Sequence, residues 1–217
     1  TLYGALNELN SHQKKIITVE DPVEYRLPRI NQVQVHPNIG LDFSTVLRAT
    51  LRQDPDILLV GEIRDKETAE IALRAAMTGH FVLSTLHTND AVSSAMRLTD
   101  IGIEGYLAAS ALNGILAQRL VRKICDNCTQ HYHPTGAEQI WLDARQEELG
   151  LDDIELKKGR GCTYCNNTGY KGRTGIFELL EINEPMADAL RRDDSAAFTV
   201  AAKTDPHYQP LVYSALE

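Results

Sequence analysis

Residues 56–62 read DILLVGE, an apolar run of four residues between an acidic turn and a glycine. A run of this kind, bounded by Asp54-Pro55-Asp56 and Gly61, is typical of a central strand in a parallel sheet, because both faces of such a strand are buried. Glu62 follows at the tip of the predicted strand. Ligands of open α/β sheets bind outside the carboxyl ends of the strands, so Glu62 is the first candidate site residue.

The segments on either side alternate between strand and helix patterns. Strands are predicted at 15–19, 32–35, 57–60, 81–86 and 175–180, and helices at 2–9, 44–53, 65–78, 91–99 and 105–123. Ser44 is the expected N-cap of the second helix, and Gly79 the expected stop of the third. The alternation predicts an α/β fold with a mostly parallel sheet covered by helices.

The length, hydrophobic content and charge of the chain exclude several classes of protein. The chain has 217 residues, of which 43% are hydrophobic, enough for one domain or one domain with an appendage. Its 22 basic and 30 acidic residues give a net charge of −8, which repels a phosphate backbone, so no nucleic-acid partner is expected unless a local basic patch exists. We find no signal-peptide pattern and no apolar run of about 18 residues, and therefore expect a cytoplasmic protein.

Two further segments place polar residues after predicted strands. TVEDPVE supplies Glu20, Asp21 and Glu24, and STLHTN supplies His87. A site that cleaves phosphate needs a carboxylate that holds magnesium through water or orients the attacking water, and a histidine can sense a phosphate. Each segment has an ordinary alternative: a solvated acidic turn in the first case, and a structural hydrogen bond of the histidine in the second.

The four cysteines form two Cys-x-x-Cys pairs, Cys125 with Cys128 and Cys162 with Cys165. Four thiolates suit a tetrahedral zinc ion without an open coordination position, which is a structural site. Without an export signal, the pairs indicate a metal rather than disulfides. The alternative is four unligated thiols.

Taken together, TVEDPVE, RATLRQDPDILLVGEIRD and GHFVLSTLHTND resemble the Asp box, the Walker B segment and the His box of the secretion and pilus superfamily of hexameric ATPases. This resemblance implies a RecA-like P-loop NTPase core that uses ATP and Mg²⁺. It also implies a homohexamer that works with an inner-membrane platform protein and other secretion or pilus-assembly components. The protein is then cytoplasmic and held at the inner membrane through its partners.

The resemblance implies a functional role only for residues that match a position in the family's motifs. Glu24 would activate the attacking water, Glu62 would support Mg²⁺ and water, and His87 would link the γ-phosphate end of the site to conformational change. Arg48 and Arg52 match arginines near the nucleotide or the neighbouring subunit; ordinary salt bridges on a helix surface are the alternative. A usual Walker B strand ends in Asp-Glu. Here Gly61 replaces the aspartate, which excludes direct Mg²⁺ ligation from that position.

The resemblance also bears on how much of the family's core is present. The family's phosphate-binding loop ends in Gly-Lys-Ser/Thr-Thr and leads into a helix similar to TLYGAL at residues 1–6. We therefore expect this chain to start about three residues after that lysine, without Walker A, and to hydrolyse ATP negligibly by itself.

The tetracysteine motif is typical of the type II secretion and pilus-extension branches. GRTGIFELLEIN at 172–183 resembles the assembly branch, and AAKTDPHYQPLVYSAL at 201–216 most resembles the ATPase of the mannose-sensitive haemagglutinin (MSHA) pilus. We expect a partial RecA-like core at 1–123, a zinc subdomain at 124–175, and a strand with helices at 176–217. Two rival hypotheses remain: a non-catalytic zinc-stapled interaction fragment and a RecA-like nucleic-acid motor.

Overall fold

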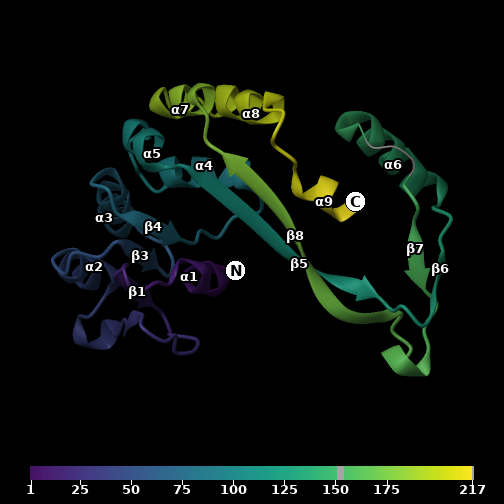
Figure 1. Cartoon of the computed structure of the whole chain (residues 1–217). Coiled ribbons are helices and arrows are strands. Elements are labelled where there is room, and N and C mark those ends of the chain that lie inside the picture. Colours follow the sequence, from purple (N-terminus) through teal and green to yellow (C-terminus); the bar gives the residue numbers. More distant parts are fainter. Residues whose placement is uncertain (151–153, 217) are drawn as a thin grey trace. The chain divides into compact units, whose positions relative to one another are not determined.

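The computed structural model describes residues 1–150 and 154–216, which form two compact units (Figure 1). Unit 1 comprises Thr1–Ile115 and Leu180–Pro206, and unit 2 comprises Leu116–Leu179 and the segment that begins at His207. The chain therefore leaves unit 1 at Ile115, returns to it at Leu180 and leaves it again after Pro206. Each unit is described by itself below.

A four-stranded parallel sheet forms the centre of unit 1, in the order β2-β1-β3-β4. Its strands are β1 (Ile16–Glu20), β2 (Asn31–Gln34), β3 (Ile57–Val60) and β4 (Phe81–Ser84). Every residue of the interior strands β1 and β3 is buried. The predicted parallel sheet with a central strand at 57–60 is confirmed, although β4 ends at Ser84, earlier than expected.

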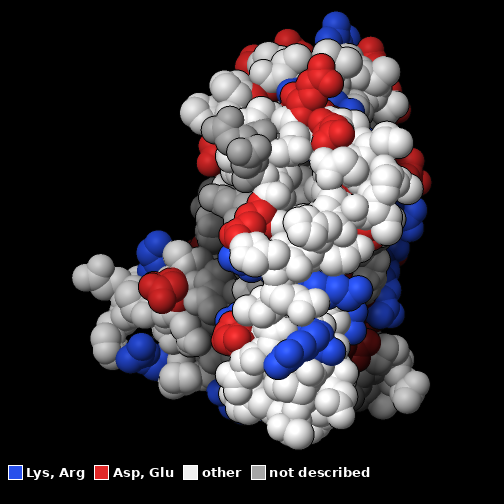
Figure 2. Space-filling view, turned by 90° about the vertical axis from the view of Figure 1, so that its right-hand side faces the viewer, with Lys and Arg blue, Asp and Glu red and all other residues white. Residues whose placement is uncertain are grey.

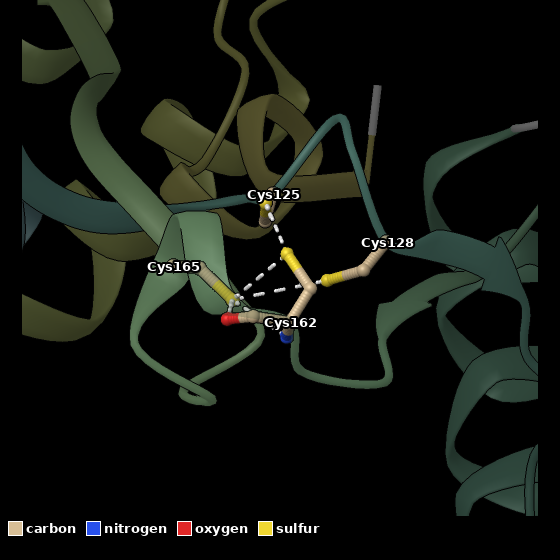
Figure 3. A group of neighbouring side chains, drawn as sticks. All are labelled: Cys125, Cys128, Cys162 and Cys165. Carbon is tan, nitrogen blue, oxygen red and sulfur yellow. Dashed lines mark hydrogen bonds between the residues drawn. The ribbon is translucent and has the colours of Figure 1, made fainter.

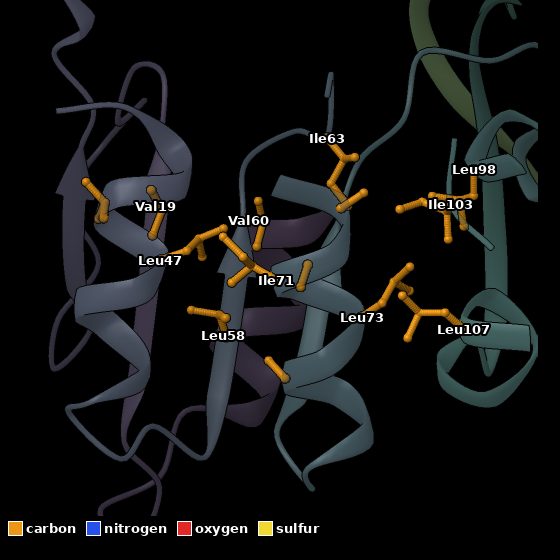
Figure 4. Packing of buried hydrophobic residues seen from close by; sticks show 14 of the residues in the cluster. Val19, Leu47, Leu58, Val60, Ile63, Ile71, Leu73, Leu98, Ile103 and Leu107 are labelled. Carbon is orange, nitrogen blue, oxygen red and sulfur yellow. The ribbon is translucent and has the colours of Figure 1, made fainter. Parts of the chain in front are cut away.

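Helix α1 (Leu2–Leu9) packs on one face of this sheet, and α2 (Phe43–Leu51) and α3 (Lys66–Met77) pack on the other. Unit 1 also contains α4 (Ala91–Asp100), α5 (Gly105–Ala111), α7 (Glu184–Arg191) and α8 (Ser195–Thr204), with the 3₁₀ turn η1 (Pro37–Ile39), and α7 contacts α5 and α8. Along β3, Ile57 and Leu59 pack in a cluster with Leu6 of α1. Leu58 and Val60 point to the opposite face and join the larger cluster with α2 and α3 (Figure 4). Burial of each such side chain contributes about 1.5–3 kcal/mol.

Aspartates begin four of these helices: α2, α3, α4 and α8, where Asp194 accepts a hydrogen bond from the Ala197 amide at 2.8 Å. The side chain of Asp42 accepts a hydrogen bond from the Thr45 amide at 2.8 Å, and Asp65 and Asp90 cap α3 and α4 in the same way. The predicted cap Ser44 is therefore wrong, because it already lies inside α2 and its hydroxyl donates to Asp42. A carboxylate two residues earlier satisfies the same free amide.

The predicted helix at 105–123 is also wrong. Helix α5 ends at Ala111, and β5 (Gly114–Ile124) follows and pairs with β8 (Tyr170–Glu181), which runs in the opposite direction (Figure 1). Periodicity alone cannot separate a short apolar helix from a strand, and the branched residues Ile115, Val121 and Ile124 favour the strand once a partner is present. That partner is long, since β8 starts well before the predicted start at 175.

Unit 2 contains the outer part of this strand pair, the antiparallel pair of β6 (Thr129–His131) with β7 (Lys157–Gly159), helix α6 (Gly136–Leu149), the 3₁₀ turn η2 (Thr163–Cys165) and α9 (Leu211–Leu216). The buried carboxylate of Glu178 on β8 holds the last segment. It accepts hydrogen bonds from the Tyr208 hydroxyl at 2.7 Å and the Leu211 amide at 2.9 Å. These bonds attach residues 208–211 to β8.

Charge is spread unevenly. Ranges 114–124 and 157–173 contain three and five basic residues, respectively, and no acidic residue, whereas the whole chain carries −8. The face drawn in Figure 2 shows side chains of both signs. The net charge of the chain therefore does not describe the local charge of β5, β7 and the first residues of β8. Among the described residues, none of the helices is both long and apolar enough to span a bilayer.

Candidate active site and metal centre

The carboxyl ends of the parallel strands β1, β3 and β4 meet at one edge of the sheet, which we call the carboxyl edge. Glu20 ends β1, Glu62 follows β3, and His87 follows β4. The structure brings two of these side chains together: His87 Nε2 lies 3.0 Å from Glu62 Oε2. Glu62 and His87, which are far apart in sequence, thus form one polar pair at this edge.

The carboxylate of Glu62 is held between a histidine and an arginine. Arg64 Nη2 lies 2.6 Å from its other oxygen, Oε1. Burial by itself would raise the pKa of Glu62, but the hydrogen bonds from Arg64 and His87 and the charges of these two groups outweigh burial and lower it. Glu62 is therefore an anion at neutral pH. The His87 side chain is 81% exposed, so it can contact both Glu62 and a ligand.

Gly61 stands where β3 comes closest to β1. Its amide donates to the Val19 carbonyl at 2.7 Å, and its own carbonyl accepts from the Thr85 hydroxyl at 2.7 Å. A Cβ atom at this position would lie 3.1 Å from the Val19 oxygen and 3.2 Å from the Glu20 Cα. The aspartate usual in a Walker B strand therefore does not fit here without a shift of β1.

The three carboxylates of TVEDPVE have different surroundings. Glu20 is only 4% exposed and accepts hydrogen bonds from Tyr3 and Thr18 and, at 3.2 Å, from Gln32 Nε2. Asp21 and Glu24 are exposed, and their carboxylates have no hydrogen-bond partner within residues 1–150 and 154–216. Glu20 is thus tied into the protein, whereas Asp21 and Glu24 can reach a ligand.

Within the described part of the chain, Arg48 and Arg52 make no hydrogen bond or ion pair with Glu20, Glu62 or His87. Arg48 pairs with Glu67 at the start of α3, with Nη2 and Oε1 2.7 Å apart, and both side chains are more than half exposed. Arg52 caps the end of α2, and the carbonyl of the next residue, Gln53, accepts from the Lys15 side chain just before β1. Since β1 starts at the amino edge of the sheet, Arg52 lies near that opposite edge.

The four cysteines come together in unit 2 (Figure 3). Their sulfur atoms all lie within 4.8 Å of one another. The Cys125–Cys162, Cys128–Cys165 and Cys162–Cys165 pairs have Sγ–Sγ distances of 3.9, 3.9 and 3.7 Å. A zinc tetrahedron with bonds of about 2.3 Å has edges of about 3.8 Å, so the cluster fits this ion, and the distances are too long for disulfides.

Close glycine packing makes this arrangement possible. The Cys125 amide donates to the Gly169 carbonyl at 3.0 Å. A Cβ on Gly159 would lie 2.0 Å from the same carbonyl oxygen, so only glycine fits there. The Gly169 amide in turn donates to Cys165 Sγ at 3.3 Å. The two Cys-x-x-Cys loops are therefore held together by their own backbone.

The thiols differ in their ease of ionisation. Burial would raise the pKa of Cys165, but hydrogen bonds from the amides of Cys162 and Gly169 lower it to about 6. Burial and the neighbouring thiols raise the pKa of Cys128 to about 12. The Cys165 thiolate therefore forms easily, whereas Cys128 beside it keeps its proton at neutral pH. A bound divalent cation would favour the thiolate form of its ligands.

Sequence reasoning did not find Tyr3, Gln32 or Arg64 as site residues. Arg64 lies two positions after Glu62, and its positive charge next to a candidate carboxylate was a usable signal. Tyr3 and Gln32 gave no comparable signal. They reach Glu20 only because α1 and β2 lie on either side of β1 in the folded chain.

A helix-covered parallel sheet with acidic and histidine side chains at its carboxyl edge defines an α/β protein of the kind that binds its ligand there. Residues 1–212 match the family described as type II/IV secretion system protein, and the chain belongs to this family. This membership confirms the resemblance inferred from the three motifs.

Two curated relatives illustrate the match. The chain is 47% identical over 193 residues to the type II secretion system ATPase E of Vibrio cholerae, an alignment that covers 89% of this chain and 38% of the relative. It is 46% identical over 196 residues to the type IV pilus assembly ATPase PilB of Thermus thermophilus, covering 90% of this chain and 22% of the relative. The chain thus spans well under half the length of these proteins.

Solved structures agree on the fold. The pilus retraction motor PilT with bound ADP superposes with a TM-score of 0.62 at 30% identity, over 92% of this chain and 47% of PilT. The Legionella pneumophila ATPase DotB superposes with a TM-score of 0.66 at 22% identity, over 99% of this chain and 50% of DotB, a similarity of fold alone.

Proposed function

We propose that this chain is part of the motor of a hexameric ATPase that powers type IV pilus assembly or type II secretion. The observation that carries the proposal is the Glu62–His87 pair at the carboxyl edge, 3.0 Å apart, with the exposed Glu24 on the loop after the neighbouring strand β1. The printed functions of the relatives, a secretion ATPase and a pilus assembly ATPase, support it.

Each residue receives a role from its surroundings. Glu24, an exposed carboxylate without an internal partner, is proposed to accept the proton of the attacking water. Glu62 stays ionised between Arg64 and His87 and is proposed to orient water. His87 is proposed to contact the γ-phosphate end of the site and, through its hydrogen bond, to couple that contact to Glu62. Mg²⁺, when bound, neutralises charge on the phosphates. Asp21 is close enough in sequence to Glu24 to face the same ligand.

Arg48 and Arg52 are proposed to act across a subunit interface. Both are exposed, and in the described part of the chain neither is paired with Glu62 or His87. Within a ring of six copies, arginines on α2 can supply positive charge to a nucleotide held by a neighbour. Glu20, already satisfied by three donors, is proposed to support the site rather than to contact nucleotide.

The tetracysteine cluster is proposed to hold one structural zinc ion. Its sulfur distances match a zinc–thiolate tetrahedron, and its four ligands leave no coordination position for a substrate. The division into a partial core at 1–123, a zinc subdomain at 124–175 and a C-terminal part at 176–217 stays a prediction.

The assignments to a branch of the family and to a cellular location rest on the resemblance of the motifs. The tetracysteine motif and the tail at 201–216 favour an assembly ATPase of the MSHA pilus type. The protein is proposed to act in the cytoplasm, bound to an inner-membrane platform protein. The 217 residues contain no Gly-Lys dipeptide and hence no phosphate-binding loop, so by themselves they should hydrolyse ATP negligibly.

The proposal is tested in the full-length protein by Glu24→Gln and Glu62→Gln, with Glu8→Gln on the exposed face of α1 as the control. The amide keeps the shape of Glu24 but accepts no proton, so turnover should fall by about 10²–10⁴-fold while nucleotide binding persists. Normal turnover of Glu24→Gln together with an inactive Glu62→Gln would exchange the two roles. Normal turnover of both variants would refute the site.

Two alternatives differ in what they bind. A zinc-stapled interaction fragment would show metal and partner binding, and the full-length protein would not hydrolyse ATP. A nucleic-acid motor would use the basic residues of β5, β7 and β8, and its affinity for duplex DNA would fall steeply with salt. Fluorescence anisotropy with labelled DNA at two salt concentrations separates this alternative from our proposal, which expects no specific binding.

A further inference from the structure

The hydroxyl group of Tyr3, on α1, binds the backbone of the loop that follows β1. The Tyr3 hydroxyl donates to Glu20 Oε2, and it accepts from the Glu24 amide at 3.2 Å and from Gln32 Nε2 at 3.3 Å. The Tyr3 ring also meets the Tyr25 ring edge-on, with centroids 4.6 Å apart. Tyr3 therefore contacts the end of β1, the loop and β2 at one point.

We propose that Tyr3 is a positioning residue for the carboxylate of Glu24. This inference rests on the role proposed for Glu24 above. Tyr3 does not contact the reacting atoms. Its hydroxyl binds the Glu24 amide and thereby fixes the position of the backbone from which the Glu24 side chain extends.

The side chains that bind the Tyr3 hydroxyl, Glu20 and Gln32, are themselves held by several hydrogen bonds. Glu20 is buried and also accepts from Thr18 on its own strand and from Gln32 on β2. Gln32 is equally well held, since its Oε1 accepts from the Leu27 amide at 2.7 Å and its Nε2 donates to the Tyr25 carbonyl at 3.2 Å. The polar group of Tyr3, Thr18, Glu20 and Gln32 thus offers fixed partners to the loop.

Among the described residues, three backbone groups of the loop from Asp21 to Leu27 are bonded to this polar group: the Glu24 amide, the Tyr25 carbonyl and the Leu27 amide. Two of them depend on the Gln32 side chain, and only the Glu24 amide depends on the Tyr3 hydroxyl. The Arg26 side chain also donates to the Gln32 carbonyl at 3.2 Å, and the Val23 amide donates to Gln34 Oε1 at 3.3 Å. Loss of the Tyr3 hydroxyl should therefore free the Glu24 amide, while the neighbouring residues of the loop stay attached.

The surroundings of Tyr3 agree with this role. Burial raises the pKa of Tyr3, and its hydrogen bond to the Glu20 carboxylate raises it further. The hydroxyl consequently keeps its proton and acts as a stable donor. A general base must sit within hydrogen-bond reach of the proton that it removes, and a displacement of about 1 Å can reduce turnover by 10²-fold.

The test uses the full-length protein with Tyr3→Phe, which removes only the hydroxyl. Tyr106→Phe on α5 is the matched control, because that hydroxyl has no partner among the described residues and lies in the same unit. We expect kcat for ATP to fall roughly 10- to 100-fold in Tyr3→Phe, with KM and the Kd of a non-hydrolysable ATP analogue changed less than about twofold. Tyr106→Phe should match the wild type in all three quantities.

A double variant distinguishes positioning from a general structural role. If Tyr3 acts through Glu24, then adding Tyr3→Phe to Glu24→Gln should lower the residual turnover no further. A second, multiplicative loss in the double variant, or a rise in KM equal to the fall in kcat, would overturn the inference. Melting temperatures of all variants show whether a loss of activity reflects unfolding.

Failure of this inference differs from failure of the proposed function. If Glu24→Gln is inactive while Tyr3→Phe keeps the wild-type kcat, then the catalytic role of Glu24 stands and the positioning role of Tyr3 is wrong. If Glu24→Gln keeps normal turnover, then the proposed base is wrong, and the role of Tyr3 is refuted together with it.

Discussion

At the scale of single residues, the carboxylates of this chain divide by what surrounds them. Glu62 is nearly buried but lies between two cationic groups, so its pKa falls instead of rising. Glu20 is buried among neutral donors and serves as an anchor. Glu24 is exposed and lacks a partner for its carboxylate among the described residues. The three glutamates thus differ in chemistry because different groups contact their carboxylates.

The Glu62 contacts predict how stability depends on pH. A carboxyl whose folded pKa is below its unfolded value, about 4.3, stabilises the fold fully above that value, and this contribution is lost as the pH falls through the folded pKa. Below about pH 4.3, the free energy of unfolding should therefore fall more in the wild type than in Glu62→Gln. The effect is modest, about 1 kcal/mol or less, because Arg64 and His87 are largely exposed.

Urea unfolding of the chain at a series of pH values from 7 to about 3 checks this expectation. Glu8→Gln serves as the control, since Glu8 is an exposed helix residue without an ion pair in the described part of the chain. If acid destabilised Glu62→Gln more than the wild type, then the folded pKa of Glu62 would be raised and the assignment of Arg64 and His87 as its stabilising partners would be wrong.

At the scale of secondary-structure elements, the approach of β3 to β1 sets a strict limit on side-chain size. Gly61 follows the last residue of β3, and its backbone is bonded to both neighbouring strands. Any Cβ there meets the β1 backbone at 3.1–3.2 Å. Backbone atoms of a central strand cannot move as easily as the end of a side chain, so this contact cannot be relieved locally.

Gly61→Ala should therefore destabilise unit 1 by about 1–3 kcal/mol, the usual effect of overpacking. Gly4→Ala in α1 is the matched control: no atom lies within 4 Å of its added Cβ, and replacing a helical glycine should stabilise by about 0.5–1 kcal/mol. Chemical denaturation monitored by far-UV circular dichroism measures both. A Gly61→Ala variant as stable as the wild type would show that β1 adapts freely.

At the scale of the whole molecule, the two units have different sources of stability. Unit 1 buries apolar residues on both faces of its sheet, and Figure 4 shows the larger of the two clusters. In unit 2 the cysteines form a buried cluster of their own. A zinc ion bound to this cluster would stabilise the unit, since the apparent free energy of zinc binding is about 10–16 kcal/mol in zinc-finger peptides.

We therefore expect about one zinc ion per chain, and we expect its removal to affect the units differently. Cys162→Ser or treatment with a chelator should make residues 116–179 sensitive to protease, while residues 1–115 stay resistant. Metal analysis by mass spectrometry and limited proteolysis with peptide mapping measure these outcomes. Thr163→Ser, next to a proposed ligand but not one itself, is the control.

Protein purified without chelator that contains no zinc and has four freely titratable thiols would contradict the metal site. Equal loss of protease resistance in both units after chelation would instead contradict their separate stability. Zinc bound with unchanged proteolysis would show that the metal does not hold the unit together.

The sequence by itself determined the parallel sheet, the order of the three motifs, the grouping of the four cysteines and the family. These features depend on local patterns: an apolar run bounded by turn residues, or a fixed spacing of two cysteines. The Glu62–His87 pair could be anticipated because the carboxyl ends of parallel strands share an edge.

Only the tertiary structure decided the features that depend on contacts between distant segments. Residues 114–124 form a strand because β8 is there to pair with them, and a single segment does not reveal its partner. Arg52 lies away from the carboxyl edge because α2 runs back along the sheet. Tyr3 reaches Glu20 because α1 packs over β1. Hydrogen bonds and burial join residues through space, and local patterns along the chain carry no signal of them.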